Sequence, residues 1–311
     1  MSARIFLLTL LAMIAFASNS LLCRAALRDT GIDAASFTFI RIFSGALALW
    51  LILQTRRKWI VDRTASPLVE SPSGLSLVTR HLSLTSGNWI SAFALFAYAA
   101  AFSFAYNTLS AGSGALLLFG AVQATMILWG FRKGERLRAI QIVGLIVAVA
   151  GLLVLVFPGL SAPPLIGSIL MVSAGVAWGV YSLRGKAVRD ATASTAGNFL
   201  RAVPFAALVS VIMLPKMHLD SLGVIYAVIS GAITSGLGYV IWYAALTGLK
   251  AASAATVQLS VPVLAATGGI LLLGEPITLR YVIASIAVLG GIFLVVIEKR
   301  KGSVSLMPVQ R

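Results

Sequence analysis

The sequence predicts an all-α integral membrane protein whose ten transmembrane helices form two inverted five-helix repeats. Hydrophobic residues make up 59% of the 311 residues and charged residues 11%, against roughly 45–50% and about 25% in soluble proteins. Apolar runs long enough to cross about 30 Å of hydrocarbon follow one another along the chain. One such run occurs twice, because Gly134-Glu135 and Gly274-Glu275 each open a long apolar segment. Gly151 and Gly291 recur within these segments at the same offset.

The expected spans are helices, because an open backbone in lipid would leave polar groups unsatisfied. The first span, with Ala15-Phe16-Ala17, also resembles a secretory signal peptide, but the repeat requires it to remain. Connections are short except for 55–87, whose Pro, Ser and charged residues predict a loop rather than a second domain. The spans are 5–23, 35–54, 88–106, 109–131, 138–157, 164–183, 195–214, 221–244, 251–273 and 279–297.

The duplication extends to the first half of each unit. At a second constant offset, Arg24 pairs with Arg184 and Arg41 with Arg201. Five spans per unit is an odd number, so the second unit must cross the membrane in the opposite sense, which is typical of secondary transporters. We therefore expect a first repeat over 1–158, and a second over 159–311 that ends in a basic tail.

The distribution of lysine and arginine predicts the topology. With the N-terminus inside, the cytoplasmic segments hold 18 of the 24 basic residues. The outer segments hold Arg24, Arg28, Lys216 and Arg280. Both termini are therefore expected in the cytoplasm, and the protein in the inner (plasma) membrane. The net charge of +15 is an orientation signal, and no nucleic-acid partner is expected.

Catalytic and metal-binding patterns are missing from the sequence. The only cysteine is Cys23, and both histidines, His81 and His218, lie in polar stretches between spans. All nine acidic residues fall in loops or at span ends, so paired carboxylates within the membrane are absent. We expect no enzyme, no metal and no cofactor. Proton-coupled transport usually needs a carboxylate within the membrane, and the spans contain none. Passive facilitation or exchange is therefore favoured.

Five short features occur together in this chain: Arg41 and Arg201 early in the second span of each unit, the two Gly-Glu turns, and Pro262. With ten spans, they resemble the EamA-type transporters of the drug/metabolite transporter superfamily, from about Ile5 to Ile297. Val122 stands at the place of Pro262 in the first unit, which is a departure from that pattern. The resemblance implies export, and a central cavity surrounded by the first, third, fourth, sixth, eighth and ninth spans.

Two arginines are the charges within spans. Insertion of arginine at the membrane centre costs about 2.5–3.5 kcal/mol. Arg41 and Arg201 either anchor an anionic substrate group or tie carbonyl groups of neighbouring helices, and their presence in both inverted units favours the structural role. Glu135 and Glu275 precede spans, so we interpret them as helix caps, with a gating role as the alternative.

Polar and aromatic residues inside the spans are the candidate substrate-binding residues. Aromatic residues near span ends often form interfacial belts instead, as we expect for Tyr106, Trp129 and Tyr243. Interhelical hydrogen bonding is the alternative for the amides. On the spans that the resemblance places around the cavity, the candidates are Asn19, Tyr98, Gln123, Trp178, Tyr181, Tyr239 and Gln258.

These observations predict a carrier of a small organic solute, such as an amino acid or related amphipathic metabolite, that works by alternating access. Exchange of anionic metabolites through Arg41 or Arg201 is a rival within transport. A channel-like pore or a membrane enzyme is a rival from another class. The expected partners are the solute and the lipid bilayer, and a homodimer is left open.

Overall fold

The computed structural model describes residues 2–64, 86–134, 138–159, 162–185, 188, 190–249, 254 and 257–302. Every regular element in these residues is helical. The segment Ser221–Leu246 contains α9 (Ser221–Val228), the π-helical η2 (Ile229–Leu237) and α10 (Gly238–Leu246). The other helices are α1 (Ala3–Asp29), α2 (Ala34–Thr64), α4 (Trp89–Tyr106), α5 (Ala111–Arg132), α6 (Ala139–Val156), α7 (Leu165–Gly185), α8 (Ala191–Ile212), η1 (Leu214–Lys216), α12 (Ser260–Leu273) and α13 (Leu279–Gly302).

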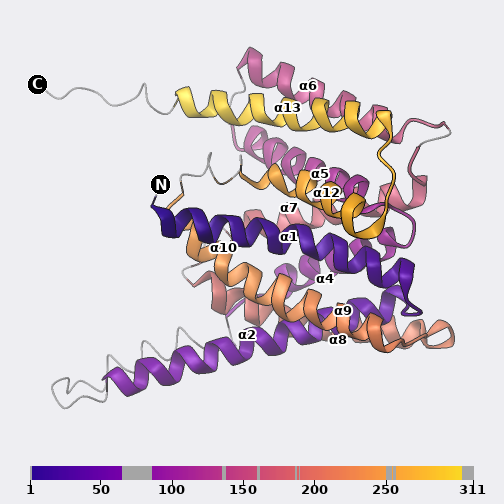
Figure 1. The fold of residues 1–311 in the computed structure, drawn as a ribbon. Helices are drawn as coiled ribbons and strands as arrows, with labels where there is room; N and C mark the ends of the chain where they lie inside the picture. The colour runs from indigo at the N-terminus through magenta and orange to yellow at the C-terminus, as the bar shows by residue number, and fades with distance from the viewer. Residues whose placement is uncertain are drawn as a thin grey trace, which may run out of the picture.

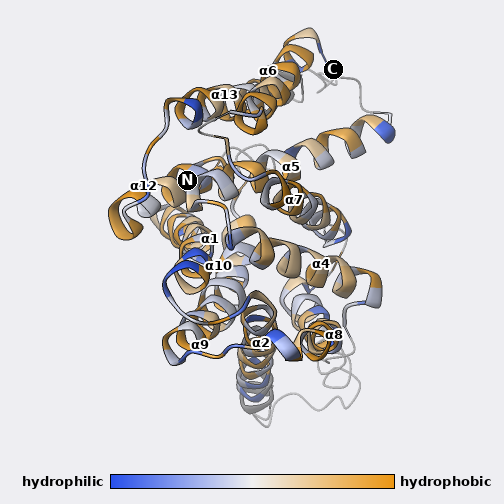
Figure 2. Ribbon diagram, turned by 90° about the vertical axis from the view of Figure 1, so that its right-hand side faces the viewer, coloured by the Kyte–Doolittle hydropathy of each residue, from blue (hydrophilic) through white to orange (hydrophobic). Residues whose placement is uncertain are grey.

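The described helices form an all-α membrane protein. Eight of them are long and apolar enough to cross a membrane, and the apolar stretches Ser260–Leu273 and Leu279–Val295 are shorter. Large apolar side chains point outward, for example Ile146 at 62% and Leu153 at 65% exposure. Figure 2 shows α6, α12 and α13 with mostly orange, hydrophobic ribbon. Such surfaces are stable when lipid covers them.

The helices pack around α1, which contacts α9, η2, α10 and α12 (Figure 1). α6 and α13 lie side by side at one edge of the bundle, and α2 packs on α8 at the opposite edge (Figure 1). We identify the two ends of the bundle by the two ends of α4. We call the end that carries Asn88 the Arg184 end, and the end that carries Asn107 the Glu275 end, after the arginine or glutamate found there.

The π-helical segment η2 packs directly on α2. A Cβ atom added at Gly231 would clash with the backbone oxygen of Arg41 and with Oγ of Ser44. π-helical turns are rare and often lie at functional sites. Close approach through glycine is a usual way for membrane helices to associate, and here it fixes the part of α2 that carries Arg41 against η2.

Pro262 lies near the start of a helix in the structure. The ninth span was expected to begin at 251, but 251–253, 255 and 256 lie outside the described residues. In the described part, α12 begins at Ser260, after a turn at Leu259. Pro262 is the third residue of α12. Proline fits the first turn of a helix, where its missing N–H would have no helical partner.

Asp33 joins two connections at the Glu275 end. Its Oδ1 accepts hydrogen bonds from the backbone N–H groups of Ala35 and Ser36 at the start of α2, both at 2.9 Å. Its Oδ2 accepts from the N–H of His218, in the connection before α9, at 3.0 Å. Partial burial alone would raise the pKa of this carboxyl, but the hydrogen bonds from Ser36, His218 and Ala35 together lower it.

We predict that Gly231→Ala lowers the thermal stability of the purified protein by several degrees, because its methyl group would overlap backbone atoms that cannot move independently. Gly290→Ala in α13 is the matched control, since an added Cβ there meets nothing within 4 Å. Thermal unfolding in detergent measures both. Equal melting temperatures for the two variants would contradict the close packing of α2 on η2.

We predict that Asp33 stabilises the fold at neutral pH and that its contribution disappears in acid. The folded-state pKa lies below the ordinary value of 3.8, so the stabilisation is present above that value and is lost as the pH falls through the lowered pKa. Asp33→Asn should therefore lower stability at pH 7 and have less effect near pH 3. A difference between variant and wild type that does not depend on pH would contradict this role.

Candidate functional site

A cavity of about 520 Å³ lies among α4, α5, α7, α8 and α10, and we call it the central cavity. It reaches the helix ends at Asn88, Gly185 and Ala191, and so extends to the Arg184 end of the bundle. Arg184 is the one charged residue among its described lining residues, and it donates to Oγ of Ser91 at 3.0 Å and to Oδ1 of Asn88 at 3.1 Å.

Aromatic rings form a continuous wall of the central cavity. The indole of Trp178 stacks on Tyr239, with ring centroids 5.2 Å apart and planes at 20°, and on Tyr181 at 5.4 Å and 28°. Hydroxyl groups fix the rings at the Arg184 end: Thr195 lies 3.1 Å from the hydroxyl of Tyr243 and 3.4 Å from that of Tyr181. The wall therefore presents flat apolar faces with polar edges.

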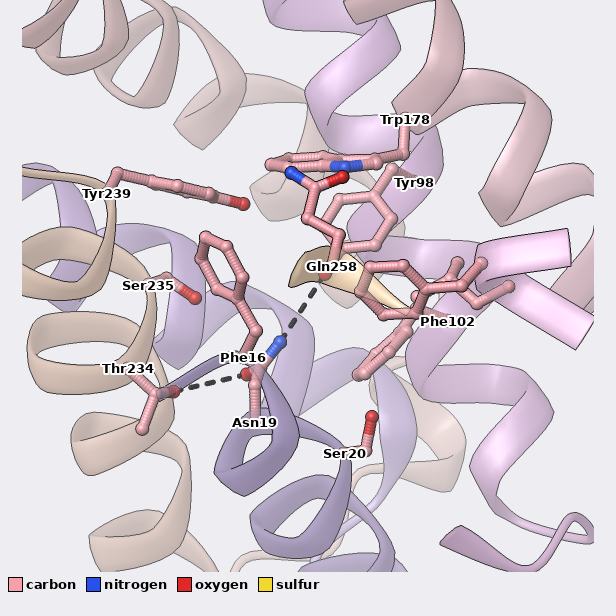
Figure 3. Close-up of a pocket in the computed structure, with 12 residues that line it drawn as sticks. Phe16, Asn19, Ser20, Tyr98, Phe102, Trp178, Thr234, Ser235, Tyr239 and Gln258 are labelled. Atoms are coloured by element: carbon pink, nitrogen blue, oxygen red, sulfur yellow. Dashed lines mark hydrogen bonds between the residues drawn. The ribbon is translucent and has the colours of Figure 1, made fainter. Parts of the chain in front are cut away.

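A second, smaller pocket of about 30 Å³ lies deeper in the bundle, and we call it the Asn19 pocket (Figure 3). It shares Phe16, Trp178, Tyr239 and Gln258 with the central cavity, so these four side chains separate the two spaces. Its other lining residues are Asn19, Ser20, Tyr98, Phe102, Leu118, Phe119, Thr234 and Ser235.

Asn19 connects three helices at the base of this pocket. Its Oδ1 accepts from the hydroxyl of Ser230 at 2.6 Å and from that of Thr234 at 3.4 Å, and its Nδ2 donates to the hydroxyl of Tyr98 at 3.4 Å. Figure 3 shows the contacts with Thr234 and Tyr98. The interhelical role that the sequence left open for Asn19 is therefore present in the structure.

The two glutamines of the site differ from Asn19. Gln123 is 5% exposed, and Gln258 extends beneath the indole of Trp178 (Figure 3). Within the described part of the chain, neither side-chain amide makes a hydrogen bond. Both side chains line the central cavity, so their amide groups are available to a ligand or to water there.

All seven residues that the sequence predicts for the site line one of these two spaces. The structure brings together Asn19, Tyr98, Gln123, Trp178, Tyr181, Tyr239 and Gln258. Sequence reasoning missed the contribution of α8, whose Ser194, Thr195 and Asn198 also line the central cavity. Their spacing of one and four residues in an otherwise apolar helix was a usable signal.

Arg41 and Arg201 have different surroundings. Arg201 donates to the carbonyl oxygens of Ser86 at 2.9 Å and of Gly197 at 3.0 Å, which matches the structural role predicted for it. Arg41 is 2% exposed, and its Nη2 donates to the hydroxyl of Tyr98 at 3.0 Å. Its Nη1 has no hydrogen-bond partner in the described chain.

An ion pair joins separate segments at the Glu275 end. Nε of Arg24 lies 3.1 Å from Oε1 of Glu275, and Nη1 of Arg24 donates to the carbonyl of Tyr106 at 2.9 Å. Oε2 of Glu275 accepts the N–H of Ala111, the first residue of α5, at 2.8 Å. Three segments distant in sequence therefore meet at one carboxylate.

Comparisons with known proteins identify the family. Residues 165–297 match the EamA-like transporter family. An uncharacterized protein of Pseudomonas aeruginosa is 54% identical over 292 residues, which cover 94% of both chains. An uncharacterized transporter of Archaeoglobus fulgidus is 30% identical over 60% of this chain and 68% of its own.

The chain belongs to the EamA-type transporters of the drug/metabolite transporter superfamily. The uncharacterized transporter YoaV of Bacillus subtilis is 23% identical over 83% of this chain and 85% of its own. A protein of known crystal structure superposes with a TM-score of 0.60, covering 94% of this chain and 98% of that one. At 17% identity this likeness supports the fold alone.

In this EamA-type transporter Glu275 is not the cap of its own helix that the sequence predicted. Thr278, not Glu275, holds the first turn of α13, because its Oγ1 accepts the N–H of Tyr281 at 3.1 Å. Glu275 instead accepts the first N–H of α5, and Glu135 lies outside the described residues.

Of the three expected belt aromatics, Trp129 is 47% exposed, as a membrane interface requires. Tyr106 is fully buried, and Tyr243 lines the central cavity. A position near a span end therefore did not distinguish outward-facing from inward-facing aromatic residues. Both tyrosines face inward, where their hydroxyl groups have partners inside the bundle.

We predict that Arg24→Gln destabilises this transporter, since hydrogen bonds to charged groups contribute about 1.5–3 kcal/mol and Glu275 would keep a buried charge. Arg280→Gln, at the same end, is the control, because Arg280 donates to the carbonyl of Phe157 and pairs with no carboxylate in the described chain. The melting temperature in detergent should fall by several degrees only for Arg24→Gln. Equal losses would show that the ion pair does not hold the Glu275 end.

Proposed function

We propose that this transporter moves a small organic solute, an amino acid or a related amphipathic metabolite, through the central cavity by alternating access. The observation that carries the proposal is the cavity itself, which combines a wall of aromatic rings with the partnerless amides of Gln123 and Gln258. Small-molecule sites have volumes of roughly 300–1,000 Å³ and a few oriented polar groups in an apolar lining, and a cavity of about 520 Å³ agrees with this.

The proposal includes ten spans in two inverted units, 1–158 and 159–311. The contact between α6 and α13 supports this symmetry. An added Cβ at Gly151 would meet the backbone nitrogen of Val288, and one at Gly291 would meet that of Ala148. The shift in residue number that relates the two Gly-Glu turns also relates Gly151 to Gly291 and Ala148 to Val288. The two contacts are therefore equivalent, as a two-fold relation between the units requires.

The proposed orientation has both termini in the cytoplasm and the chain in the inner membrane. The excess of lysine and arginine in the segments expected inside supports it. In this orientation the Arg184 end of the cavity faces the cytoplasm, while the Arg24–Glu275 ion pair lies at the outer end. A solute would then enter the cavity from the cytoplasm, which agrees with export.

Exchange of anionic metabolites is a second candidate, favoured by one observation. Nη1 of Arg41 is buried without a hydrogen-bond partner in the described chain, whereas Arg201 is bound to carbonyl groups. Of the two arginines, Arg41 is therefore the one that would bind an anion. Family membership favours a carrier over the pore and the membrane enzyme that the sequence alone left open.

Counterflow in proteoliposomes tests the proposal, with a panel of labelled amino acids, amines and small organic anions. We predict saturable uptake that is stimulated by unlabelled solute on the opposite side. Flux without such stimulation would indicate a pore, and no uptake of any compound by folded protein would remove these solute classes.

We predict that Trp178→Ala raises the half-saturation concentration for the transported solute at least tenfold, because it removes the ring that stacks on both Tyr239 and Tyr181. Stacked aromatic contacts contribute about 0.5–1.5 kcal/mol beyond the area that they bury. Trp129→Ala is the matched control, because that ring faces outward. Similar kinetic changes in both variants would contradict a solute site in the central cavity.

A further inference from the structure

The Asn19 pocket presents hydrogen-bond donors. Ser235, in η2, is 2% exposed, and its hydroxyl has no partner in the described chain. Figure 3 shows this hydroxyl directed toward the pocket that Ser235 lines. A buried hydroxyl in this state costs free energy, which a bound acceptor would recover.

Asn19 contributes a donor rather than an acceptor. The hydroxyl of Ser230 donates to its Oδ1 at 2.6 Å, and that of Thr234 approaches the same oxygen at 3.4 Å. The acceptor atom of the amide is therefore in use. The amide nitrogen carries two hydrogens, of which one is directed to the hydroxyl of Tyr98.

Tyr98 contributes the third donor because of Arg41. A guanidinium has only donors, so the hydrogen bond from Nη2 of Arg41 makes the oxygen of Tyr98 an acceptor. The hydroxyl hydrogen of Tyr98 is then left to donate elsewhere, and Tyr98 lines the Asn19 pocket.

The same arginine makes the pocket electrically positive. The guanidinium carbon of Arg41 lies 5.3 Å from the ring centroid of Tyr98 and 4.8 Å from that of Phe102, both of which line the pocket. No carboxylate of the described chain pairs with Arg41, and no lining residue of the pocket is acidic. A buried charge without a counterion is expensive, and an anion in the pocket would offset it.

We propose that the Asn19 pocket binds the carboxylate group of the transported solute. Tyr98, Ser235 and Asn19 would donate to the carboxylate oxygens, and Arg41 acts through Tyr98 as a positioning residue. About 30 Å³ accommodates this small group but not the rest of a metabolite, which would extend past Trp178 and Tyr239 into the central cavity. This inference rests on the proposed function, and it specifies a monocarboxylate with an apolar or aromatic body.

Two matched probes test the inference on the full-length protein in nanodiscs by calorimetry at pH 7. 3-Phenylpropionate carries a carboxylate, and 3-phenylpropanamide has the same body without the charge. We expect the carboxylate to bind at least tenfold more tightly than the amide. Equal affinity would overturn the carboxylate site while leaving a solute site in the central cavity intact. Binding of neither probe would also overturn it, and the counterflow panel would then decide the proposed function separately.

Ser235→Ala should lower the affinity for 3-phenylpropionate about tenfold, since a hydrogen bond to a charged group is worth roughly one power of ten or more. Its affinity for the amide should change much less. Ser285→Ala is the matched control, because Ser285 in α13 also has a buried hydroxyl without a partner but lines neither space. Equal effects of the two variants would overturn the assignment of Ser235.

Tyr98→Phe and Arg41→Gln test the positioning role. Both should reduce the preference for the carboxylate over the amide, because one removes the donor and the other removes the charge behind it. If Arg41→Gln fails to fold, Tyr98→Phe keeps the ring and decides the question. An unchanged preference in folded Tyr98→Phe would overturn the role of the Arg41–Tyr98 pair.

Discussion

The hydrogen bond from Arg41 to Tyr98 is the interaction on which the centre of this transporter depends. It joins α2 to α4, and through Asn19 it extends to α1 and to η2. In a membrane protein such polar groups cannot be satisfied by bulk water, so they must find partners inside the bundle. The close approach of Gly231 to the backbone of Arg41 holds η2 in this network.

The two ends of the bundle are built on different physical principles. At the Glu275 end, one carboxylate binds an arginine and the N-terminus of a helix, and Nη1 of that arginine donates to the backbone carbonyls of Tyr106 and Asn107. At the Arg184 end, the cavity is bounded by hydroxyls, amides and aromatic edges, whose contacts are weaker and easier to exchange for those of a solute.

Much of the fold could be predicted from sequence because lipid permits few backbone structures. Long apolar runs marked the helices, and the repetition of Gly134-Glu135 at Gly274-Glu275 predicted an internal symmetry. The residues proposed for the site also converge, because polar atoms inside apolar helices have few places to lie. The sequence pattern could not predict tertiary features. Examples are the turn at Leu259 before α12 and the contact of Glu275 with the distant helix α5.

The pair Arg41 and Arg201 shows the same limit. Their positions are equivalent under the sequence offset that also relates Arg24 to Arg184, yet one faces carbonyl groups and the other an aromatic, hydroxyl-lined interior. The sequence repeat therefore predicted equivalent positions for the two arginines, but not equivalent surroundings. Residues on α8 were missed because their polarity is mild and no charge marks them.

Substrate protection of a cysteine in the central cavity tests the central claim most directly. Ser182 lines the cavity and is half-buried, so Ser182→Cys in a Cys23→Ser background provides a reactive group beside the proposed solute. Ser221→Cys, at an exposed position at the start of α9, is the control. A solute that supports counterflow should slow alkylation of the cysteine at position 182 and leave that at position 221 unchanged. Equal rates at position 182 with and without that solute would contradict a solute site in the central cavity.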